Sequence, residues 1–401
     1  MENDNLSNPN DSNQTPFKTP DQVAATDDHQ SGSPLISTQP IKAHRDNKRI
    51  HKYWPPSKKT WLIIIIVVIL IAGTSLLIFF NHPKKSVSIK PKKQITQQQP
   101  KPLTVASSLT GLQVSPATNQ LPITAIMVEN SIYARPESGL GEAGVVFEAL
   151  TEGGISRFVA LYQSDKPISV GPVRSARPYF IGWVLGFDAA YAHVGGSPQA
   201  LNDISLWGVK DLNQFFNGSY YQRISSRQAP HNVYTTLAEL HNLELAKGYT
   251  SSNFISWPRQ AAKPLKNPTV TKINLTLSYS AYNVSYVYDS STNTYNRYNG
   301  GSPQIDADTN KQISVPVVIA IDVPETNGPL DSSNAYYSNY QYIGSGKAYI
   351  FQNGGITIGQ WSKSSNNSQI LFKTNSGQPI SLNPGEVWIT AITSGSAISY
   401  K

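Results

Sequence analysis

Residues Trp61 to Phe80 form a run of twenty residues without a charged side chain, between two lysine-rich segments. At about 1.5 Å of rise per residue, a helix of this length spans about 30 Å, the thickness of the hydrocarbon core of a bilayer. In lipid a single segment satisfies all of its own backbone hydrogen bonds only as a helix. We therefore predict one transmembrane helix at 61–80, with residues 1–60 on one side of the membrane and residues 81–401 on the other.

Two other interpretations of this run are less consistent with the sequence. A cleaved signal peptide has its apolar region close to the N-terminus and ends in a small-residue cleavage site. Here sixty residues precede the run, and Phe79-Phe80-Asn81 is a poor cleavage site. A buried helix of a globular core would normally carry a polar face, which this run lacks.

The charges that flank the run do not decide its orientation. Seven basic residues lie in 41–60 and six in 81–101, so the positive-inside rule has almost no asymmetry to act on. A short polar tail before the span and a long body after it are typical of a signal-anchor with an exported body. The absence of cysteine from the chain is compatible with export. We expect the N-terminus in the cytoplasm and the body in the extracytoplasmic space.

The net charge of +8 is concentrated next to the predicted membrane span. Residues 1–60 carry eight basic and seven acidic side chains, residues 81–120 six and none, and residues 121–401 nineteen and eighteen. The body is therefore nearly neutral, and we expect no nucleic-acid partner. Each lysine near an anionic leaflet or wall polymer adds about 1 kcal/mol to binding. Alternatively, the lysines only keep a solvated tether extended.

Composition divides the rest of the chain into a tail, a linker and two parts of a body. Residues 1–60 are polar and predict a disordered cytoplasmic tail. Residues 81–118 are rich in Lys, Gln and Pro and predict a basic, semi-extended linker. The body is expected to consist of a first domain at 119–255, a joint at 256–269 and a second domain at 270–401.

The two domains differ in their expected fold class. In the first, short apolar runs predict strands, the 151–156 connection predicts a hairpin, and Ser175 and Ser197 are candidate N-caps of helices. The expected strands are 123–128, 145–150, 157–162 and 189–194, and the expected helices are 175–187, 198–206 and 235–245. This order predicts an α/β or α+β domain. From residue 270, apolar and polar residues alternate between Gly-containing turns, which predicts a mainly β domain.

Six of the ten arginines lie between residues 135 and 227, with several acids and two histidines beside them. In the segment 171–180 a Gly-Pro turn leads into an expected helix N-terminus that Arg174 and Arg177 flank. This combination favours a carboxylate or phosphate ligand. Alternatively, these arginines pair with Glu148 or Glu152 and only stabilise the domain. The candidate ligand-binding residues are Arg157, Arg174, Arg177, Arg223, Arg227, His193 and His231.

Evidence for catalysis in the sequence is weaker. Glu148 and Glu152 are the only obvious carboxylate pair, but residues four apart on one strand lie about 13 Å apart, far for paired acid–base work. A set of Ser197, Asp203 and His231 lacks the G-x-S-x-G pattern of a nucleophile elbow. The candidate catalytic groups of this alternative are Glu148, Glu152, His193 and His231.

Cofactor and metal motifs are absent from the sequence. It contains no cysteine, no H-x-x-x-H or H-E-x-x-H spacing and no phosphate-binding loop. The segment 306–310 begins like a calcium loop but lacks the required Gly and Glu, so it predicts a plain turn. We expect neither a metal nor a cofactor.

Four ordered blocks in the first domain resemble the YerB-like family, a bacterial domain of unknown function with N- and C-terminal parts. The blocks are AGVVFEALTEGGISR at 143–157, GPVRSARPYF at 171–180, HVGGSPQAL at 193–201 and RISSRQAPHNVYT at 223–235. Later pieces, GQW at 359–361 and LNPGEVWI at 382–389, resemble the C-terminal part. The resemblance covers about residues 112–395. It implies an envelope-anchored bacterial protein of unassigned activity and supplies no catalytic residues.

The chain departs from this family in its anchor. Members similar to YerB are commonly lipoproteins held by an N-terminal cysteine. Because this chain has no cysteine, we expect the helix at 61–80 to replace the lipid.

Three hypotheses about function remain at this stage. The first is a non-enzymatic, membrane-tethered protein that binds an anionic glycan, peptidoglycan or a partner protein through its arginine-rich face. The many tyrosines of the second domain would assist by binding sugar rings, or else they only form strands. The second hypothesis is an enzyme that acts on wall glycans, and the third is a scaffold whose tail meets a cytosolic partner.

Overall fold

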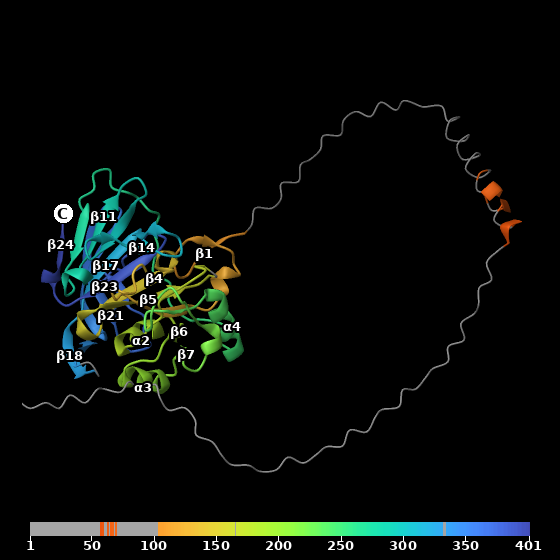
Figure 1. The fold of residues 1–401 in the computed structure, drawn as a ribbon. Coiled ribbons are helices and arrows are strands. Elements are labelled where there is room, and N and C mark those ends of the chain that lie inside the picture. Colours follow the sequence, from red (N-terminus) through yellow and green to blue (C-terminus); the bar gives the residue numbers. More distant parts are fainter. Residues whose placement is uncertain are drawn as a thin grey trace, which may run out of the picture. The chain divides into compact units, whose positions relative to one another are not determined.

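The computed structural model describes residues 103–401 except 165, 332 and 333, together with residues 57–59, 62, 63, 65–67 and 69. The predicted tail, the transmembrane helix at 61–80 and the linker up to residue 102 lie wholly or mostly outside this part of the chain. Those residues of 61–80 that are described are helical. Among the described residues, no helix has the length and hydrophobicity that a membrane span requires. Gln97–Lys401 forms one compact unit, the body (Figure 1).

A mixed ten-stranded sheet runs through the body, and both halves of the sequence contribute to it (Figure 1). Its two halves meet where β23 pairs in parallel with β4, with Val387 opposite Val145. In spatial order the strands are β22 (Leu371–Lys373), β21 (Gly355–Lys363), β20 (Gly344–Gln352), β17 (Val317–Asp322), β23 (Val387–Ile392), β4 (Val145–Leu150), β5 (Ser156–Tyr162), β3 (Thr124–Glu129), β6 (Ala190–His193) and β7 (Lys210–Asn213). The first half of the body is thus mixed and the second mainly β, as predicted. The shared sheet was not predicted.

The central strands are buried on both faces. Every residue of β3, β4, β5, β6 and β23 is buried, which explains why they appear in the sequence as continuous apolar runs. The four strands predicted in the first domain correspond to β3, β4, β5 and β6. The predicted 151–156 hairpin connection is also confirmed. It contains Gly153 at φ +63°, a left-handed conformation that favours glycine.

Helices cover both faces of this sheet. Helices α2 (Pro178–Leu185) and α3 (Pro198–Leu206) pack on one face and α4 (Leu237–Lys247) packs on the other. Ser197 Oγ accepts a hydrogen bond from Ala200 N, which confirms this predicted N-cap. Thr236, where a helix was predicted to begin, caps α4 by accepting from Glu239 N.

The prediction that Ser175 caps a helix was wrong. Arg177 is the N-cap of α2, and Pro178 is its first residue. The preceding residues stay extended because Val173 and Ala176 bridge to the backbones of Val128 and Gly196.

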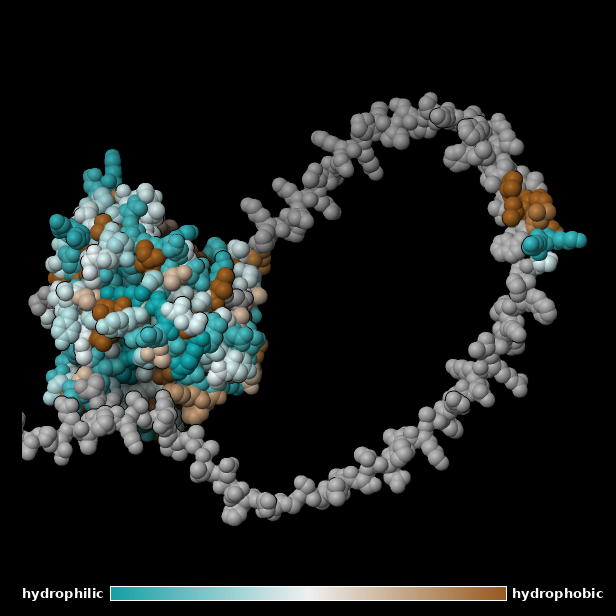
Figure 2. Space-filling model, in the orientation of Figure 1, coloured by the Kyte–Doolittle hydropathy of each residue, from teal (hydrophilic) through white to brown (hydrophobic). Residues whose placement is uncertain are grey.

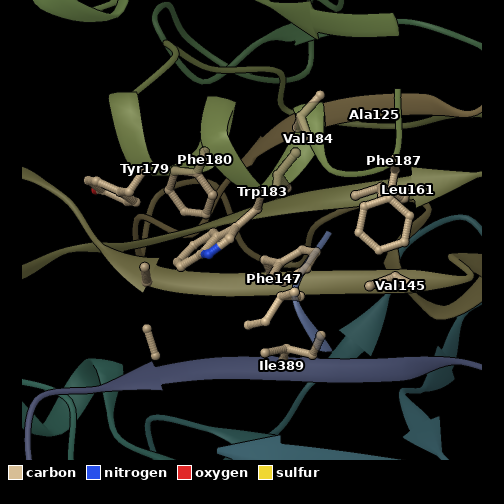
Figure 3. Packing of buried hydrophobic residues seen from close by; sticks show 14 of the residues in the cluster. Ala125, Val145, Phe147, Leu161, Tyr179, Phe180, Trp183, Val184, Phe187 and Ile389 are labelled. Atoms are coloured by element: carbon tan, nitrogen blue, oxygen red, sulfur yellow. The ribbon is translucent and has the colours of Figure 1, made fainter. Parts of the chain in front are cut away.

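Two hydrophobic cores lie on the two faces of the ten-stranded sheet. In the core under α2, Phe147 stacks on Trp183 with ring centroids 5.1 Å apart, and Phe187 meets Phe147 edge to face (Figure 3). Such aromatic pairs each add about 0.5–1.5 kcal/mol beyond the burial of their area. The other core lies between the ten-stranded sheet, α4 and a second, antiparallel sheet. That sheet consists of β13 (Ser302–Pro303), β12 (Thr294–Asn299), β11 (Val284–Asp289), β10 (Lys272–Leu275) and β24 (Ile398–Tyr400), with β16 (Ser314–Val315) beside β12.

Short hairpins and 3-10 turns complete the body. The hairpins are β1 (Val105–Ala106) with β2 (Gln113–Val114), β8 (Gln222–Arg223) with β9 (Val233–Tyr234), β14 (Ile305–Asp306) with β15 (Lys311–Gln312) and β18 (Glu325–Leu330) with β19 (Tyr336–Tyr340). The 3-10 turns are η1 (Thr118–Gln120), η2 (Leu140–Glu142), η3 (Glu152–Gly154), η4 (Gly218–Tyr220), η5 (Ser280–Tyr282) and η6 (Gly395–Ala397).

The body begins before residue 119, within the segment predicted as linker. Leu109, in the loop between β1 and β2, is buried in the core under α2. It fits there because residue 144 is glycine: a Cβ at Gly144 would lie 2.5 Å from a Leu109 methyl carbon. The predicted joint at 256–269 is also held against the body, since Trp257 is buried and its Nε1 donates to Ile370 O at 2.9 Å.

Candidate functional site

Most candidate residues lie at one edge of the ten-stranded sheet. Strands β3, β4, β6, β7, β17 and β23 all run in the same direction, so their carboxyl ends share this edge. We call it the carboxyl edge. In sheets built from parallel strands, ligands bind outside the carboxyl ends, where the connecting loops form the site.

Two buried arginines at the carboxyl edge share one carboxylate. The Arg157 guanidinium pairs with Glu152 Oε1, and Arg177 donates from Nε to Glu152 Oε2 at 2.9 Å. Burial raises the pKa of Glu152, but the two guanidiniums outweigh burial and lower it to about 2. Burial lowers the pKa of Arg157 to about 10, so its guanidinium remains charged at neutral pH. The three side chains together carry one net positive charge.

A second cluster at this edge joins Glu129, Arg174 and His231. Glu129 ends β3 and is 4% exposed, and Arg174 Nε lies 3.3 Å from its Oε1. His231 Nδ1 lies 2.9 and 3.0 Å from the two oxygens of Glu129, and the His231 ring is in contact with Tyr133. A carboxylate that accepts from Nδ1–H leaves Nε2 of a neutral imidazole with its lone pair, which is the form of a general base.

Glu129 is one of the acids noted beside the arginines in the sequence, but it was not among the candidate ligand-binding or catalytic residues. It follows directly after an apolar run, at the position where a buried strand ends. An acidic residue at the end of a buried strand is the signal in the sequence that would have identified it.

Two arginines come from the β8–β9 hairpin: Arg223, on β8, is exposed, and Arg227, in the loop, is half-buried. Arg227 donates to Tyr133 O at 3.2 Å and to Pro136 O at 2.7 Å, and Arg223 donates to Asn232 Oδ1 at 2.9 Å. Within the part of the chain that the structure describes, neither guanidinium forms an ion pair with a carboxylate. Tyr133, Phe215 and Phe216 are 72%, 68% and 81% exposed, and Phe215 lies over Gly195, in the loop that follows β6.

We call Tyr133, Phe215, Phe216, Arg223 and Arg227 the aromatic–arginine surface. Large exposed rings are uncommon on a face that is otherwise polar. Figure 2 shows that the visible face of the body is mostly hydrophilic, with hydrophobic residues in small separate groups.

Glu148 and His193, both predicted site residues, have no exposed surface at all. Glu148 is fully buried, and its Oε2 lies 2.9 Å from Nη2 of Arg297. Glu148 therefore does not share the arginines that pair with Glu152. His193 is also fully buried, with Nδ1 2.7 Å from Gly195 O and Nε2 2.9 Å from Asp211.

The other predicted groupings take structural roles. Ser197 caps α3, and Asp203 is a buried residue of the same helix, so neither contributes to the His231 cluster. The 306–310 segment is a turn, in which Asp306 Oδ1 accepts from Asp308 N, as predicted. Among the described residues, no group of three or more His, Asp or Glu side chains is arranged to hold a metal ion. Tyr286 and Tyr295 of the second half are core residues, whereas Tyr279 and Tyr336 are exposed.

Comparison with known proteins identifies the family. Residues 109–250 match "Protein of unknown function (DUF3048) N-terminal domain" and residues 273–389 match its C-terminal domain. The "Putative lipoprotein YerB" of Bacillus subtilis (strain 168) is 30% identical over 292 residues, which cover 71% of this chain and 85% of that protein. The chain belongs to the DUF3048 family. The predicted resemblance to YerB-like proteins is thus confirmed.

A solved structure agrees with this assignment. The crystal structure of YerB protein from Bacillus subtilis is similar to this DUF3048 chain with a TM-score of 0.66 at 28% identity, covering 74% of this chain and 99% of that one. In the present structure the residues matched as N-terminal domain include β3 to β7, and those matched as C-terminal domain include β17 and β20 to β22. The two parts of the DUF3048 family therefore share the ten-stranded sheet here.

Proposed function

We propose that this DUF3048 protein is a membrane-anchored, extracytoplasmic protein that binds an anionic component of the bacterial envelope. The name of its relative, "Putative lipoprotein YerB", supports attachment to a membrane. Because this chain has no cysteine to carry a lipid, the apolar run at 61–80 takes the role of the anchor. The tail at 1–60 then lies in the cytoplasm and the body outside it.

The aromatic–arginine surface is the observation that carries the binding proposal. Arg223 is exposed and Arg227 half-buried, and neither guanidinium forms an ion pair in the described part of the chain, so both are available to carboxylates or phosphates. The exposed rings of Tyr133, Phe215 and Phe216 offer flat apolar faces on which sugar rings stack. Arg227 is already held by two backbone carbonyls, so less side-chain entropy is lost on binding.

The pairing of the carboxylates at the carboxyl edge is more consistent with a binding protein than with an enzyme that hydrolyses glycans. A glycosidase needs two carboxyl groups facing each other across an open cleft. Glu129, Glu148 and Glu152 each face a guanidinium of the body instead, and Glu148 has no exposed surface.

The binding proposal predicts the effect of removing both arginines of the aromatic–arginine surface. We expect Arg223→Gln/Arg227→Gln to weaken binding of the body to purified cell wall by about tenfold or more, because each charge-assisted contact contributes on the order of 1 kcal/mol. Co-sedimentation of residues 97–401 with wall that carries its anionic polymers, and with wall stripped of them, measures this. Phe215→Ser/Phe216→Ser should also weaken binding, but with little dependence on salt.

Lys263→Gln/Lys266→Gln is the matched control for the arginine variant. Both lysines are exposed, lie far along the chain from the surface and change the net charge by the same amount. The proposal is wrong if this control and the arginine variant bind equally well, or if stripped wall binds as tightly as intact wall.

The Glu129–His231 pair supports a second candidate, an acid–base enzyme acting on wall material. Under the binding proposal, we expect the body to release no soluble fragments from purified wall. If chromatography of the supernatant detects fragments, and His231→Gln and Glu129→Gln each abolish their release, the enzymatic candidate replaces the first. The carboxamide of Glu129→Gln keeps the size of the side chain but no longer stabilises an imidazolium.

A further inference from the structure

A pocket of about 590 Å³ opens on the α2 and α3 side of the carboxyl edge. Its walls are the β18–β19 hairpin and the first residues of α2 and α3. None of the residues of the aromatic–arginine surface lines it. Its volume is within the range of about 300–1,000 Å³ that is usual for small-molecule sites.

We propose that this pocket binds a short peptide through its free terminal carboxylate, with Arg177 as the residue that recognises the charge. The proposal does not depend on envelope binding by the aromatic–arginine surface, because the two sites share no residue. The proposed ligand has one anionic end, amide groups and a small apolar portion.

An unbalanced positive charge lies at the wall of this pocket. Arg177 lines the pocket, is only 4% exposed, and shares Glu152 with Arg157, so two buried cations face one anion. A buried charge without a full counter-charge is unfavourable, and a bound carboxylate would neutralise it. The one acidic residue of the lining, Asp331, accepts a hydrogen bond from Ala335 N at 2.9 Å within the tip of the hairpin.

The Arg177 guanidinium is held in a fixed orientation before any ligand binds. Its carbon lies 5.0 Å from the centroid of the Tyr337 ring, a cation–π contact with the hairpin. On its other side, Glu152 accepts from Nε, and Ala176 O accepts from Nη1 at 2.6 Å. Such pre-organisation reduces the entropy lost when a ligand binds.

The other lining residues match a peptide. Leu330 and the Tyr337 ring offer apolar contact, and Gln199, Ser338 and Asn339 offer amide and hydroxyl groups for the peptide backbone. No side chain caps the first turn of α2, so no side-chain oxygen offsets the partial positive charge of this helix end. Arg177 and Pro178, at the start of α2, line the pocket. Charge, shape and polar groups therefore point to the same ligand class.

The carboxylate requirement is tested with matched peptides. N-acetyl-Ala-Ala, in its all-L and all-D forms, is titrated into the body, residues 97–401, and its carboxamide is titrated in parallel. We expect the acid of at least one form to bind about tenfold or more tightly than its amide, with calorimetry or NMR chemical shifts as the readout. The proposal is overturned if acid and amide bind equally, or if no acid binds at up to about 10 mM, the weak limit for ligands of this size.

Charge changes at Gln199 locate the site without disturbing the buried arginines. Gln199 is exposed at the start of α3, so Gln199→Glu should weaken binding of the acid and Gln199→Lys should strengthen it, each by about threefold to tenfold. Ser205→Glu, on an exposed position of the same helix outside the pocket, is the control and should change binding little. Equal effects of Gln199→Glu and Ser205→Glu would place the ligand elsewhere. Unchanged peptide binding in Arg223→Gln/Arg227→Gln would separate this site from the aromatic–arginine surface.

Discussion

Replacing Arg297 with methionine is expected to destabilise the body by about 3–5 kcal/mol, because it leaves a carboxylate buried without its cation. Arg297, on β12, and Glu148, on β4, are both fully buried. Arg297 Nη2 lies 2.9 and 3.0 Å from the two oxygens of Glu148. Its remaining donors are satisfied by Gln304 Oε1 at 2.5 Å and the Tyr286 hydroxyl at 2.6 Å.

Urea unfolding of the body measures this effect, with Arg223→Met as the matched control. Arg223 is exposed, and its replacement should change the free energy of unfolding by no more than about 0.5 kcal/mol. The double variant Arg297→Met/Glu148→Met removes both charges and should recover part of the stability that the single variant loses. A single-variant loss as small as that of Arg223→Met, or a double variant less stable than the single, would contradict this account.

This ion pair also explains how the two halves of the body are joined. Glu148 belongs to the ten-stranded sheet and Arg297 to the second sheet, and the Arg297 guanidinium lies 4.2 Å from the centroid of the Trp388 ring of β23. Trp388 Nε1 and Thr390 Oγ1 donate to Glu148 Oε2 at 3.3 and 3.2 Å. One carboxylate from the first half is thus satisfied entirely by residues of the second half and by Ser156. Glu148 is therefore a structural residue of the fold.

The local elements of the first half were predictable because their signals are local. Strands β3 to β6 are buried on both faces and so consist of continuous apolar residues. The predicted cap Ser197 acts within one helical turn. The prediction failed at Ser175, where backbone pairing of Val173 and Ala176 with distant residues keeps the chain extended up to Arg177.

Long-range pairing was not predictable from these patterns. The β23–β4 pair joins residues such as Thr390 and Glu148, which are 242 positions apart, and an apolar strand carries no mark of its neighbour. The same limit applied to the candidate site. The sequence offered Glu148 or Glu152 as the partner of Arg174 and Arg177. Arg177 does pair with Glu152, but Arg174 pairs with Glu129, and Glu148 pairs with Arg297, 149 positions away. Partner choice among arginines depends on the tertiary fold.

The Arg157–Glu152–Arg177 cluster is expected to make the body sensitive to acid. The two guanidiniums lower the pKa of Glu152 from 4.5 to about 2 against the opposing effect of burial. A carboxyl whose folded pKa is lowered contributes stability above its unfolded pKa, and this contribution is lost as the pH falls through the folded pKa. We therefore expect the free energy of unfolding to fall by about 3 kcal/mol between pH 4.5 and pH 2 because of this group.

Glu137 should have the opposite pH dependence, which makes it the control for Glu152. Burial raises the pKa of Glu137 to about 7, so its neutral form contributes stability below about pH 4.5, and that contribution is lost as the pH rises through 7. Urea unfolding of the body from pH 2 to pH 8 should show that Glu152→Gln flattens the acid side of the profile and Glu137→Gln the neutral side. If the free energy of unfolding of Glu152→Gln falls as steeply below pH 4.5 as that of the unaltered body, other carboxylates cause the loss of stability in acid. The shared ion pair would then be weaker than its geometry implies. When a carboxylate held by two guanidiniums takes up a proton, the folded state should lose about 3 kcal/mol of stability.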